Sequence, residues 1–309
     1  MNTFPYAYIR GQTVKIKDAH IPIQSKVIHY GLGVYAGIRG HWHNGNLYLF
    51  RPKDHFERMK NGVKMLGMPW TMSYADFRKI LTGLIRKNKI RSDVYIRPLV
   101  YAGSTQIVPT LEGSEPDFAL YMISFGHYMN TGGGLKLKVS KWVRVDDDMI
   151  PTKAKCTGLY ANSALAKSEA VRAGFDEAVM LNRDGSVAEA SSSNLFGVKN
   201  GVLYAPPLSA NNLDGITRRS IIELAKKELG LKVKEVRFKK ADLYKFDEVF
   251  LTGTACKIVW VKQVDNKKIG PESSLGGKMG PVVKQLKALI DKAVINELPG
   301  YEKWCEKVY

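Results

Sequence analysis

The sequence predicts an α+β protein that is built from two domains. Short segments in which apolar and polar residues alternate predict antiparallel strands, and segments with apolar residues at helical spacing lie among them. Strands and helices do not follow one another in a βαβ rhythm, and a GxGxxG motif is absent, which argues against a Rossmann sheet. A chain of 309 residues is too long for one ordinary core, so two domains are expected.

A run of glycines after Thr131 marks the expected boundary between the domains. Three glycines in a row cannot hold a regular element at low cost, so they are typical of a linker. We therefore predict a smaller N-terminal α+β domain at residues 1–128, a glycine-rich linker at residues 129–134 and a larger C-terminal domain at residues 135–309.

The N-terminal domain is expected to combine strands with two amphipathic helices. Turn signals such as Gly11-Gln12 and Asn44-Gly45 separate the alternating segments. Ser73 can cap the second helix, and Phe77 opens its apolar face. The expected strands are residues 7–10, 13–16, 47–50, 94–101 and 118–125, and the expected helices are residues 54–66 and 73–89.

The C-terminal domain is expected to begin with a strand at residues 135–145, where apolar and polar residues alternate cleanly. Asn162 or Ser163 can cap a helix that Gly174 ends, and Gly230 ends a second helix. The other expected strands are residues 177–182, 186–191, 248–252 and 256–264. The first expected helix ends at residue 173, and two further helices occupy residues 218–229 and 281–296.

The composition is globular, with 45% apolar and 25% charged residues. The net charge of +18 is shared equally by the two halves of the chain, without a basic arm, so we predict no nucleic-acid partner. Three cysteines without CxxC spacing indicate neither a disulfide framework nor a metal site. No apolar run suits a membrane span and the N-terminus lacks the core of a signal peptide, so a cytoplasmic protein is predicted.

Four places in the sequence could carry chemistry. Lys155 ends an irregular segment just before a helix and offers an amine. Glu189 is a lone carboxylate between two alanines of an expected strand. Residues 215–217, Gly-Ile-Thr, open a helix, where free N–H groups favour an anion such as phosphate. The turn at residues 253–255, Gly-Thr-Ala, offers further N–H groups and a hydroxyl.

Arg97 is a fifth candidate, because it shares one face of its expected strand with Tyr95 and is costly to bury without an anion. Each candidate has an ordinary alternative. Arg97 could reach solvent at a sheet edge, Lys155 could be a surface lysine, and Glu189 could be a strand-edge acid. The two glycine-containing segments could be a simple cap and a simple turn. The residues alone leave these alternatives open.

Several ordered motifs that span nearly the whole chain resemble one family. They are HYGLGVYAGIR, YIRPL, IPTKAKCTGLY, VAEASSSNLF, LDGITRRSII and EVFLTGTA. Their order and spacing resemble the branched-chain amino acid aminotransferases. These are pyridoxal-phosphate enzymes of fold type IV, a group that also includes D-amino acid transaminases and aminodeoxychorismate lyases. The resemblance implies that fold, with residues 135–309 as the domain that binds pyridoxal 5'-phosphate.

The resemblance implies that Lys155, rather than Lys153, forms the covalent link to the cofactor and moves the substrate proton as general base and acid. It implies that Tyr160 contacts the ring oxygen, and that Glu189 keeps the pyridine nitrogen protonated so that the ring can accept electrons. An arginine, helix N–H groups and a threonine would bind the phosphate. The implied cofactor-binding residues are Arg58, Lys155, Tyr160, Glu189, Leu213, Gly215, Ile216, Thr217 and Thr254.

The implied reaction is a ping-pong transfer of the amino group of leucine, isoleucine or valine to 2-oxoglutarate. Three tyrosines would surround the substrate side chain, an arginine would meet the distal carboxylate of glutamate, and backbone N–H groups would bind the α-carboxylate. Amino acids and 2-oxo acids are therefore the expected small-molecule partners. The implied substrate-binding residues are Tyr30, Tyr35, Tyr95, Arg97, Thr254 and Ala255.

The sequence departs from the family pattern at three places. Ala36 and Lys257 stand where the family usually has glutamates. Residues 102–109 lack the glycine-rich pattern of a loop that commonly reaches the active site of a neighbouring subunit. A D-amino acid or (R)-amine transaminase, or an aminodeoxychorismate lyase-like enzyme, therefore remains an alternative. The resemblance also implies a homodimer or a larger homo-oligomer.

Overall fold

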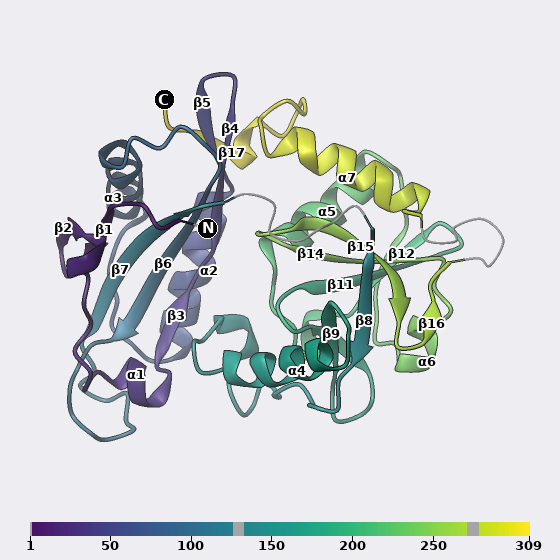
Figure 1. Cartoon of the computed structure of the whole chain (residues 1–309), viewed down its shortest axis with the longest axis horizontal. Helices are drawn as coiled ribbons and strands as arrows, with labels where there is room; N and C mark the ends of the chain where they lie inside the picture. Colours follow the sequence, from purple (N-terminus) through teal and green to yellow (C-terminus); the bar gives the residue numbers. More distant parts are fainter. Residues whose placement is uncertain (1, 126–132, 271–277) are drawn as a thin grey trace. The chain divides into compact units, whose positions relative to one another are not determined.

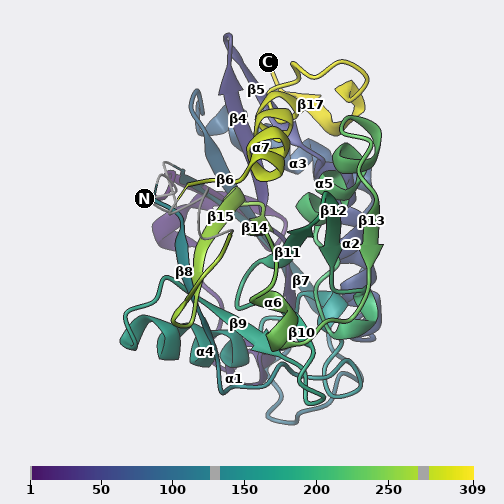
Figure 2. The same ribbon diagram turned by 90° about the vertical axis from the view of Figure 1, so that its right-hand side faces the viewer.

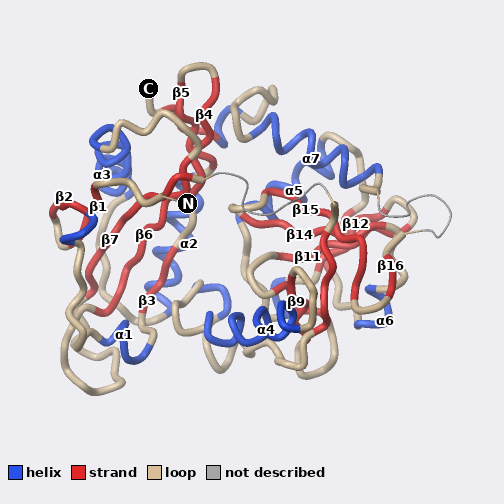
Figure 3. Tube along the Cα trace, in the orientation of Figure 1, coloured by secondary structure: helices blue, strands red, loops and turns tan. Residues whose placement is uncertain are grey.

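The structure is a computed structural model that describes residues 2–125, 133–270 and 278–309. The chain divides into two compact units, and Figure 1 follows the chain through them by colour. Each unit combines helices with a sheet, as the red strands and blue helices of Figure 3 show, which confirms the predicted α+β class. The first unit consists of Met1–His127, Ala154–Leu159 and Ala293–Tyr309, and the second of Tyr128–Lys153 and Tyr160–Lys292.

The described residues of the first unit form one sheet and three α-helices. The strands are β1 (Tyr6–Ile9), β2 (Gln12–Lys15), β3 (Gly33–Tyr35), β4 (Ile38–His43), β5 (Asn46–Phe50), β6 (Val94–Ala102), β7 (Pro116–Ser124) and β17 (Cys305–Lys307), and the helices are α1 (Lys26–Tyr30), α2 (Pro52–Met65) and α3 (Tyr74–Lys87). In the described part of the chain the strand order is β17, β5, β4, β6, β7, β1 and β2, and β3 also pairs with β6. All of these pairings are antiparallel.

Apolar faces of α2, α3 and the sheet form the core of the first unit. Phe56 and Met59 of α2 and Phe77 of α3 are buried, as their helical spacing predicted. The hydroxyl of Ser73 accepts a hydrogen bond from the Asp76 N–H at 3.1 Å, which confirms the predicted N-cap of α3. The two amphipathic helices were therefore placed within two residues of their observed starts.

Two segments of the predicted C-terminal domain belong to the first unit instead. Ala293–Tyr309 joins it because β17 pairs with β5, and the Val308 N–H donates to the Leu47 carbonyl at 3.0 Å. Ala154–Leu159 joins it through hydrogen bonds to β3 and the residues before it. Residues 129–132 of the predicted linker lie outside the described part of the chain.

Where the structure describes it, the second unit consists of a mixed sheet and four α-helices. The strands are β8 (Leu135–Val139), β9 (Glu177–Leu181), β10 (Val187–Ala190), β11 (Asn194–Lys199), β12 (Val202–Ala205), β13 (Val233–Glu235), β14 (Glu248–Gly253), β15 (Lys257–Val264) and β16 (Lys267–Lys268), and the helices are α4 (Tyr160–Arg172), α5 (Ile216–Lys227), α6 (Lys240–Leu243) and α7 (Pro281–Ala293). The described strands follow the order β10, β9, β8, β15, β14, β11, β12 and β13, all of which Figure 2 labels. Strand β16 pairs with β15.

Two parallel crossovers occur among the described strands of this unit, β8–α4–β9 and β12–α5–β13, although the sequence showed no βαβ rhythm. Strands β8 and β9 are parallel and α4 connects them, with contacts to both. The predicted strand at residues 135–145 was too long, because β8 ends at Val139. The hydroxyl of Ser140 then donates to Glu169 of α4 at 2.7 Å, and Trp142 and Val143 are exposed. The alternation of apolar and polar residues after Val139 therefore does not mark a strand that buries one of its faces in the core.

Helix α7 is attached to the sheet of the second unit by the buried Glu248 of β14. The two carboxylate oxygens of Glu248 accept hydrogen bonds from the N–H groups of Val282 at 3.1 Å and Val283 at 2.9 Å. These N–H groups belong to the first turn of the helix, where the helix dipole favours a negative charge. None of the described helices is both long and apolar enough to span a bilayer.

Candidate active site

The predicted site residues fall into two groups, one in each unit. Lys155 belongs to the first unit because its segment is hydrogen-bonded along β3. The Tyr35 N–H donates to the Lys155 carbonyl at 3.4 Å, and the Thr157 N–H donates to the Gly33 carbonyl at 2.8 Å. Lys155 has a φ of 53°, in the left-handed region that residues with a Cβ rarely adopt. Such backbone strain is concentrated at functional positions, and here the flanking hydrogen bonds hold it.

The side chain of Lys155 lies against an aromatic ring that it shares with Arg97. The Nζ atom of Lys155 is 5.0 Å from the centroid of the Tyr35 ring. The Cζ atom of Arg97 is 4.5 Å from the same centroid and 5.2 Å from the centroid of the Tyr95 ring. These distances are those of cation–π contacts. The structure thus brings four predicted site residues together, and we call Tyr35, Tyr95, Arg97 and Lys155 the Lys155 cluster.

Two further predicted residues also lie in the first unit. Arg58 is a buried residue of α2, with 9% of its surface exposed. Tyr30 ends α1 and is half-buried, and its ring centroid is 6.1 Å from that of His29. The ring and cation contacts that define the Lys155 cluster among the described residues do not include Tyr30. Its place beside a substrate side chain stays a prediction.

In the second unit, Glu189 is a buried carboxylate with fixed partners. It lies on β10, where a bulge interrupts the pairing with β9, and 5% of its surface is exposed. Its Oε1 is 2.8 Å from Arg144 Nη2, and the side-chain amide of Asn194 donates to its Oε2 at 2.9 Å. The Leu213 N–H lies 3.3 Å from the same Oε2. A buried guanidinium therefore compensates the buried negative charge.

Arg144 and Asn194 were not among the predicted site residues. Arg144 lies in the expected strand at residues 135–145 and continues its alternation of apolar and polar residues. Only 4% of its surface is exposed, and its Nε donates to the Asn211 carbonyl at 3.1 Å. Asn194 begins a strand whose first five residues are buried, and an amide in such an apolar run was the available signal. A buried polar residue needs partners, and Glu189 is one of them.

The predicted anion site at the start of α5 is connected to Glu189 through Asn194. Gly215 is the N-cap residue, and no side chain caps the helix in the described part of the chain. The N–H groups of Ile216 and Thr217, both buried, belong to the first helical turn. First-turn N–H groups have no intrahelical partner and suit a phosphate. A Cβ at Gly215 would collide with the side-chain oxygen of Asn194, so only glycine fits there.

We expect Gly215→Ala to lower the free energy of unfolding by about 1–3 kcal/mol, because Asn194 must move and release its hydrogen bond to Glu189. Gly83 in α3 provides a matched control, since a Cβ there would meet nothing within 4 Å. We expect Gly83→Ala to raise the free energy of unfolding by about 0.5–1 kcal/mol. Urea denaturation of both variants measures the difference. Equal changes in the free energy of unfolding of the two variants would contradict the close packing of Asn194 against Gly215.

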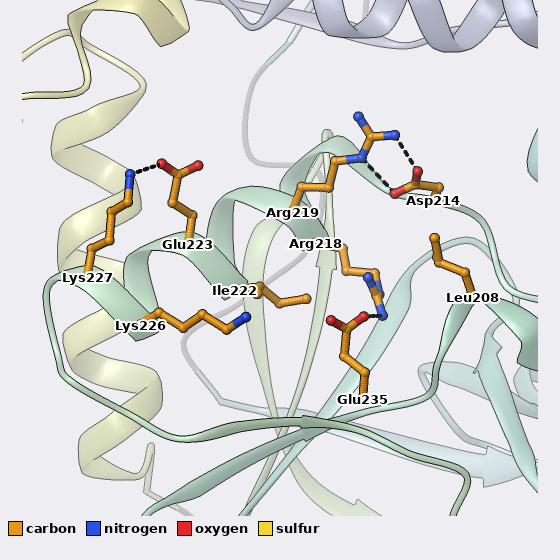
Figure 4. Close-up of a pocket in the computed structure, with 9 residues that line it drawn as sticks. All are labelled: Leu208, Asp214, Arg218, Arg219, Ile222, Glu223, Lys226, Lys227 and Glu235. Carbon is orange, nitrogen blue, oxygen red and sulfur yellow. Dashed lines mark hydrogen bonds and ion pairs between the residues drawn. The ribbon is translucent and has the colours of Figure 1, made fainter.

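The two arginines that follow Thr217 in α5 are engaged elsewhere. They line an open groove of about 470 Å³ that Figure 4 shows. Arg218 Nη2 is 2.6 Å from Glu235 Oε2, and Arg219 forms a bidentate pair with Asp214 (Figure 4). Their charges are therefore paired with carboxylates of the same unit. The backbone N–H groups of the first turn of α5, rather than these two arginines, are therefore available to bind an anion.

The remaining predicted residues of the second unit lie in turns or at a helix end. Thr254 and Ala255 form the turn between β14 and β15 and are half-buried. Tyr160 is the first residue of α4, so this helix begins before the predicted caps. Lys153 forms an ion pair with Asp147 at 2.6 Å. Lys153 is therefore committed to a carboxylate, whereas Lys155 lies against the Tyr35 ring.

The three departures from the family pattern have definite places. Ala36 is buried, and its N–H donates to the Pro98 carbonyl at 3.0 Å. Lys257 has a φ of 55° and forms an ion pair with Asp291 of α7. The loop after β6 carries Ile107, which is 78% exposed. Two of the three positions thus pack within their own unit and the third is a surface loop. For the described residues, no cluster of His, Cys, Asp and Glu suits a metal ion.

Comparison with known proteins is consistent across sequence and structure. The family model described as Amino-transferase class IV matches residues 33–264. A probable branched-chain-amino-acid aminotransferase of Aquifex aeolicus is 40% identical over 306 residues, covering 98% of this chain and 97% of the relative. The branched-chain-amino-acid aminotransferase of Escherichia coli strain K12 is 34% identical over 307 residues, with the same two coverages.

Solved structures of such enzymes superpose on the whole chain. A branched-chain aminotransferase of Thermoproteus uzoniensis, solved with norvaline, has a TM-score of 0.94 at 34% identity and full coverage of both chains. The branched-chain amino acid aminotransferase of Thermobaculum terrenum, solved in its PLP-form, has a TM-score of 0.92 at 29% identity, again with full coverage of both chains. The predicted two-domain fold of type IV is therefore confirmed. The chain belongs to the class IV aminotransferase family and is a transaminase.

Proposed function

We propose that this aminotransferase uses pyridoxal 5'-phosphate to move the amino group of leucine, isoleucine or valine to 2-oxoglutarate in a ping-pong reaction. The observation that carries the proposal is the Lys155 amine, held on a left-handed backbone against Tyr35 in a chain of this family. The relatives named as branched-chain aminotransferases support the substrate class. A related enzyme solved with N-(5'-phosphopyridoxyl)-L-glutamate supports both the cofactor and the acceptor.

The residues of this chain fit the proposed cofactor. Pyridoxal phosphate needs an amine for its covalent link, a carboxylate for its ring nitrogen and N–H donors for its phosphate. Lys155 offers the amine, Glu189 the carboxylate and the first turn of α5 the N–H donors. Arg58 and Thr254 would add to the phosphate contacts, and Tyr160 would contact the ring oxygen. When bound, the cofactor supplies an electron sink for the Cα position of the amino acid.

Each proposed role follows from the chemistry of the side chain. The Nζ of Lys155 would hold the cofactor, and its amine would accept the Cα proton of the substrate and later return it. Glu189 would accept a hydrogen bond from the ring nitrogen, and Arg144 Nη2, 2.8 Å from Glu189 Oε1, holds this carboxylate in place. The N–H groups of residues 254–255 bind the substrate α-carboxylate. Tyr30, Tyr35 and Tyr95 surround its apolar side chain.

A donor screen tests the proposal against its alternatives. Formation of glutamate from 2-oxoglutarate with L-leucine, L-isoleucine and L-valine is the expected result, and coupled assays of both products measure it. Transfer from D-leucine or from an (R)-amine in place of the L-amino acids would contradict the proposed substrate class. Release of pyruvate from aminodeoxychorismate without transfer to 2-oxoglutarate would indicate the lyase.

Arg97→Ala is expected to raise the KM for glutamate and 2-oxoglutarate by about 10- to 100-fold, the value of a charge-assisted hydrogen bond. The KM for leucine should change by less than about threefold, because an apolar side chain makes no such bond. Arg91→Ala is the matched control, since Arg91 also lies against aromatic rings of the first unit, 5.4 Å from the Tyr309 centroid, and is exposed. Steady-state kinetics with both substrate pairs measures the change. Equal losses with leucine and glutamate would exclude this role for Arg97.

We further propose that the chain forms a homodimer or a larger homo-oligomer. The loop between β6 and β7 exposes Ile107 and Val108, which are 78% and 52% accessible, and association would remove this apolar surface from water. The buried Lys26 attaches the loop to its unit, since its Nζ donates to the Thr110 carbonyl at 2.8 Å. Light scattering on the purified protein gives the mass. The cytoplasmic location stays a prediction.

A further inference from the structure

The ring and cation contacts of the Lys155 cluster continue beyond Tyr95 to a carboxylate. The rings of Tyr95 and Phe125 are stacked, with centroids 5.2 Å apart and planes at 26°. The Cζ atom of Arg39 is 4.8 Å from the Phe125 centroid. The Nη2 atom of Arg39 is 3.1 Å from Asp93 Oδ2. We call Asp93, Arg39, Phe125 and Tyr95 the Asp93 column, and its last member is in contact with Arg97.

The strand register explains why these side chains line up. Arg39 of β4 lies directly opposite Tyr95 of β6, so the two side chains leave the same face of the sheet. Tyr95 is also opposite Ile123 of β7, and Phe125 follows Ile123 by two residues, which returns it to that face. A Cβ at Gly37 would collide with the hydroxyl of Tyr95, so the backbone there fits closely against this ring. The column is therefore built into the sheet.

Asp93 is itself held firmly at the end of the column. The Trp42 N–H donates to its Oδ1 at 2.9 Å, and His41 Nδ1 lies 3.6 Å from its Oδ2. Burial alone would raise the pKa of Asp93, but the hydrogen bonds from His41 and Trp42 and the charge of Arg39 lower the pKa to about 2. The carboxylate is therefore ionised at neutral pH, and its hydrogen bonds fix the direction from which it meets Arg39.

We propose that Asp93 is a positioning residue that sets substrate specificity through Arg97. The carboxylate orients the Arg39 side chain. The Arg39 guanidinium and the two stacked rings restrict one another's movement, and the Tyr95 ring restricts the side-chain conformations of Arg97. The inference rests on the proposed function, in which Arg97 meets the distal carboxylate of glutamate. A long arginine side chain loses rotamer freedom when it binds a carboxylate, and one that is already ordered loses less. The column would therefore favour dicarboxylate substrates without touching them.

The test compares single half-reactions of the holoenzyme with L-glutamate and with L-leucine. Asp93→Asn keeps the size of the side chain and removes its charge. We expect the apparent dissociation constant for glutamate to rise by about fivefold, within the range that coupled neighbours show, and that for leucine to stay within about twofold. The rate at saturating leucine should not change. Stopped-flow absorbance of the bound cofactor measures both constants.

Asp117→Asn is the matched control. Asp117 lies on β7 of the same sheet and pairs with Arg10 at 3.1 Å and with the Tyr101 hydroxyl at 2.7 Å, outside the column. We expect equal small changes with both substrates in this variant. If Asp93→Asn does not fold, Phe125→Leu interrupts the column while keeping an apolar side chain, and the same selective loss is expected.

A double-variant cycle separates positioning from general stability. If Asp93 acts through Arg97, adding Asp93→Asn to Arg97→Ala should cause little further loss with glutamate. The inference would be overturned if Asp93→Asn caused its full loss of glutamate affinity in the Arg97→Ala background. It would also be overturned if Asp93→Asn alone lowered the affinity for leucine and for glutamate equally. Either result would leave the proposed function intact. If Arg97→Ala impaired glutamate and leucine equally, the proposed role of Arg97 itself would be contradicted. The Arg97→Ala variant is therefore measured before the Asp93 variants.

Discussion

Lys155→Ala is expected to reduce amino transfer by about 10⁴-fold or more, because the chain would lose both its covalent link to the cofactor and its proton carrier. The purified variant should also lack the visible absorbance of the covalently bound cofactor. Initial rates with leucine and 2-oxoglutarate, together with an absorbance spectrum, measure both effects.

Lys153→Ala is the matched control for that variant. The two lysines are separated by one residue, but Lys153 forms an ion pair with Asp147 and Lys155 lies against Tyr35. Removing a partly exposed ion pair is worth about 0–1 kcal/mol, so we expect Lys153→Ala to fold and to retain most of its activity. Near-normal turnover in Lys155→Ala, or its loss only in Lys153→Ala, would reverse the assignment.

Glu189→Gln is expected to have the second largest effect, because it acts on chemistry and on stability. Without the carboxylate the ring nitrogen loses its acceptor, and we expect turnover to fall by about 10²-fold or more. Arg144, with 4% of its side chain exposed, would keep a buried charge without its partner. Breaking such a pair on one side costs about 3–5 kcal/mol of unfolding free energy. Initial rates and urea denaturation measure the two losses separately.

Glu177→Gln separates the two parts of that expectation. Glu177 is a buried carboxylate of β9, the strand beside β10, and it pairs with Lys167 at 3.1 Å and accepts the Ala178 N–H at 2.7 Å. We expect a loss of stability in this variant with turnover per folded molecule near that of the wild type. If Glu189→Gln lost stability but kept its turnover, Glu189 would be structural only.

Local patterns allowed the helices α2, α3, α5 and α7 and the arrangement of β6 to be predicted from the sequence. Ser73 marked the start of α3, and the period of two on β6 placed Tyr95 and Arg97 on one face. Side-chain preferences and periodicity depend on residues within a few positions, so they can be read along the chain. The choice of Lys155 over Lys153 came from the resemblance and stays a prediction.

Non-local pairings could not be predicted in the same way. Nothing in Ala154–Leu159 or in β17 indicates that hydrogen bonds to β3 and pairing with β5 place them in the first unit. Arg144 could not be identified as a site residue because its partner Glu189 is 45 positions away and because its own segment has the alternating pattern of a strand. Asp93 gave no signal either, since its role depends on the register of β4 against β6. These features are set by long-range pairing rather than by local pattern.

Borohydride reduction of the purified holoenzyme, followed by tandem mass spectrometry of its peptides, tests the central claim most directly. Reduction makes the covalent link between lysine and cofactor permanent, so the modified residue can be located. We expect the phosphopyridoxyl group on Lys155 alone. A modification on Lys153 or another lysine, or unmodified peptides after incubation with the cofactor, would contradict the assignment of the active site.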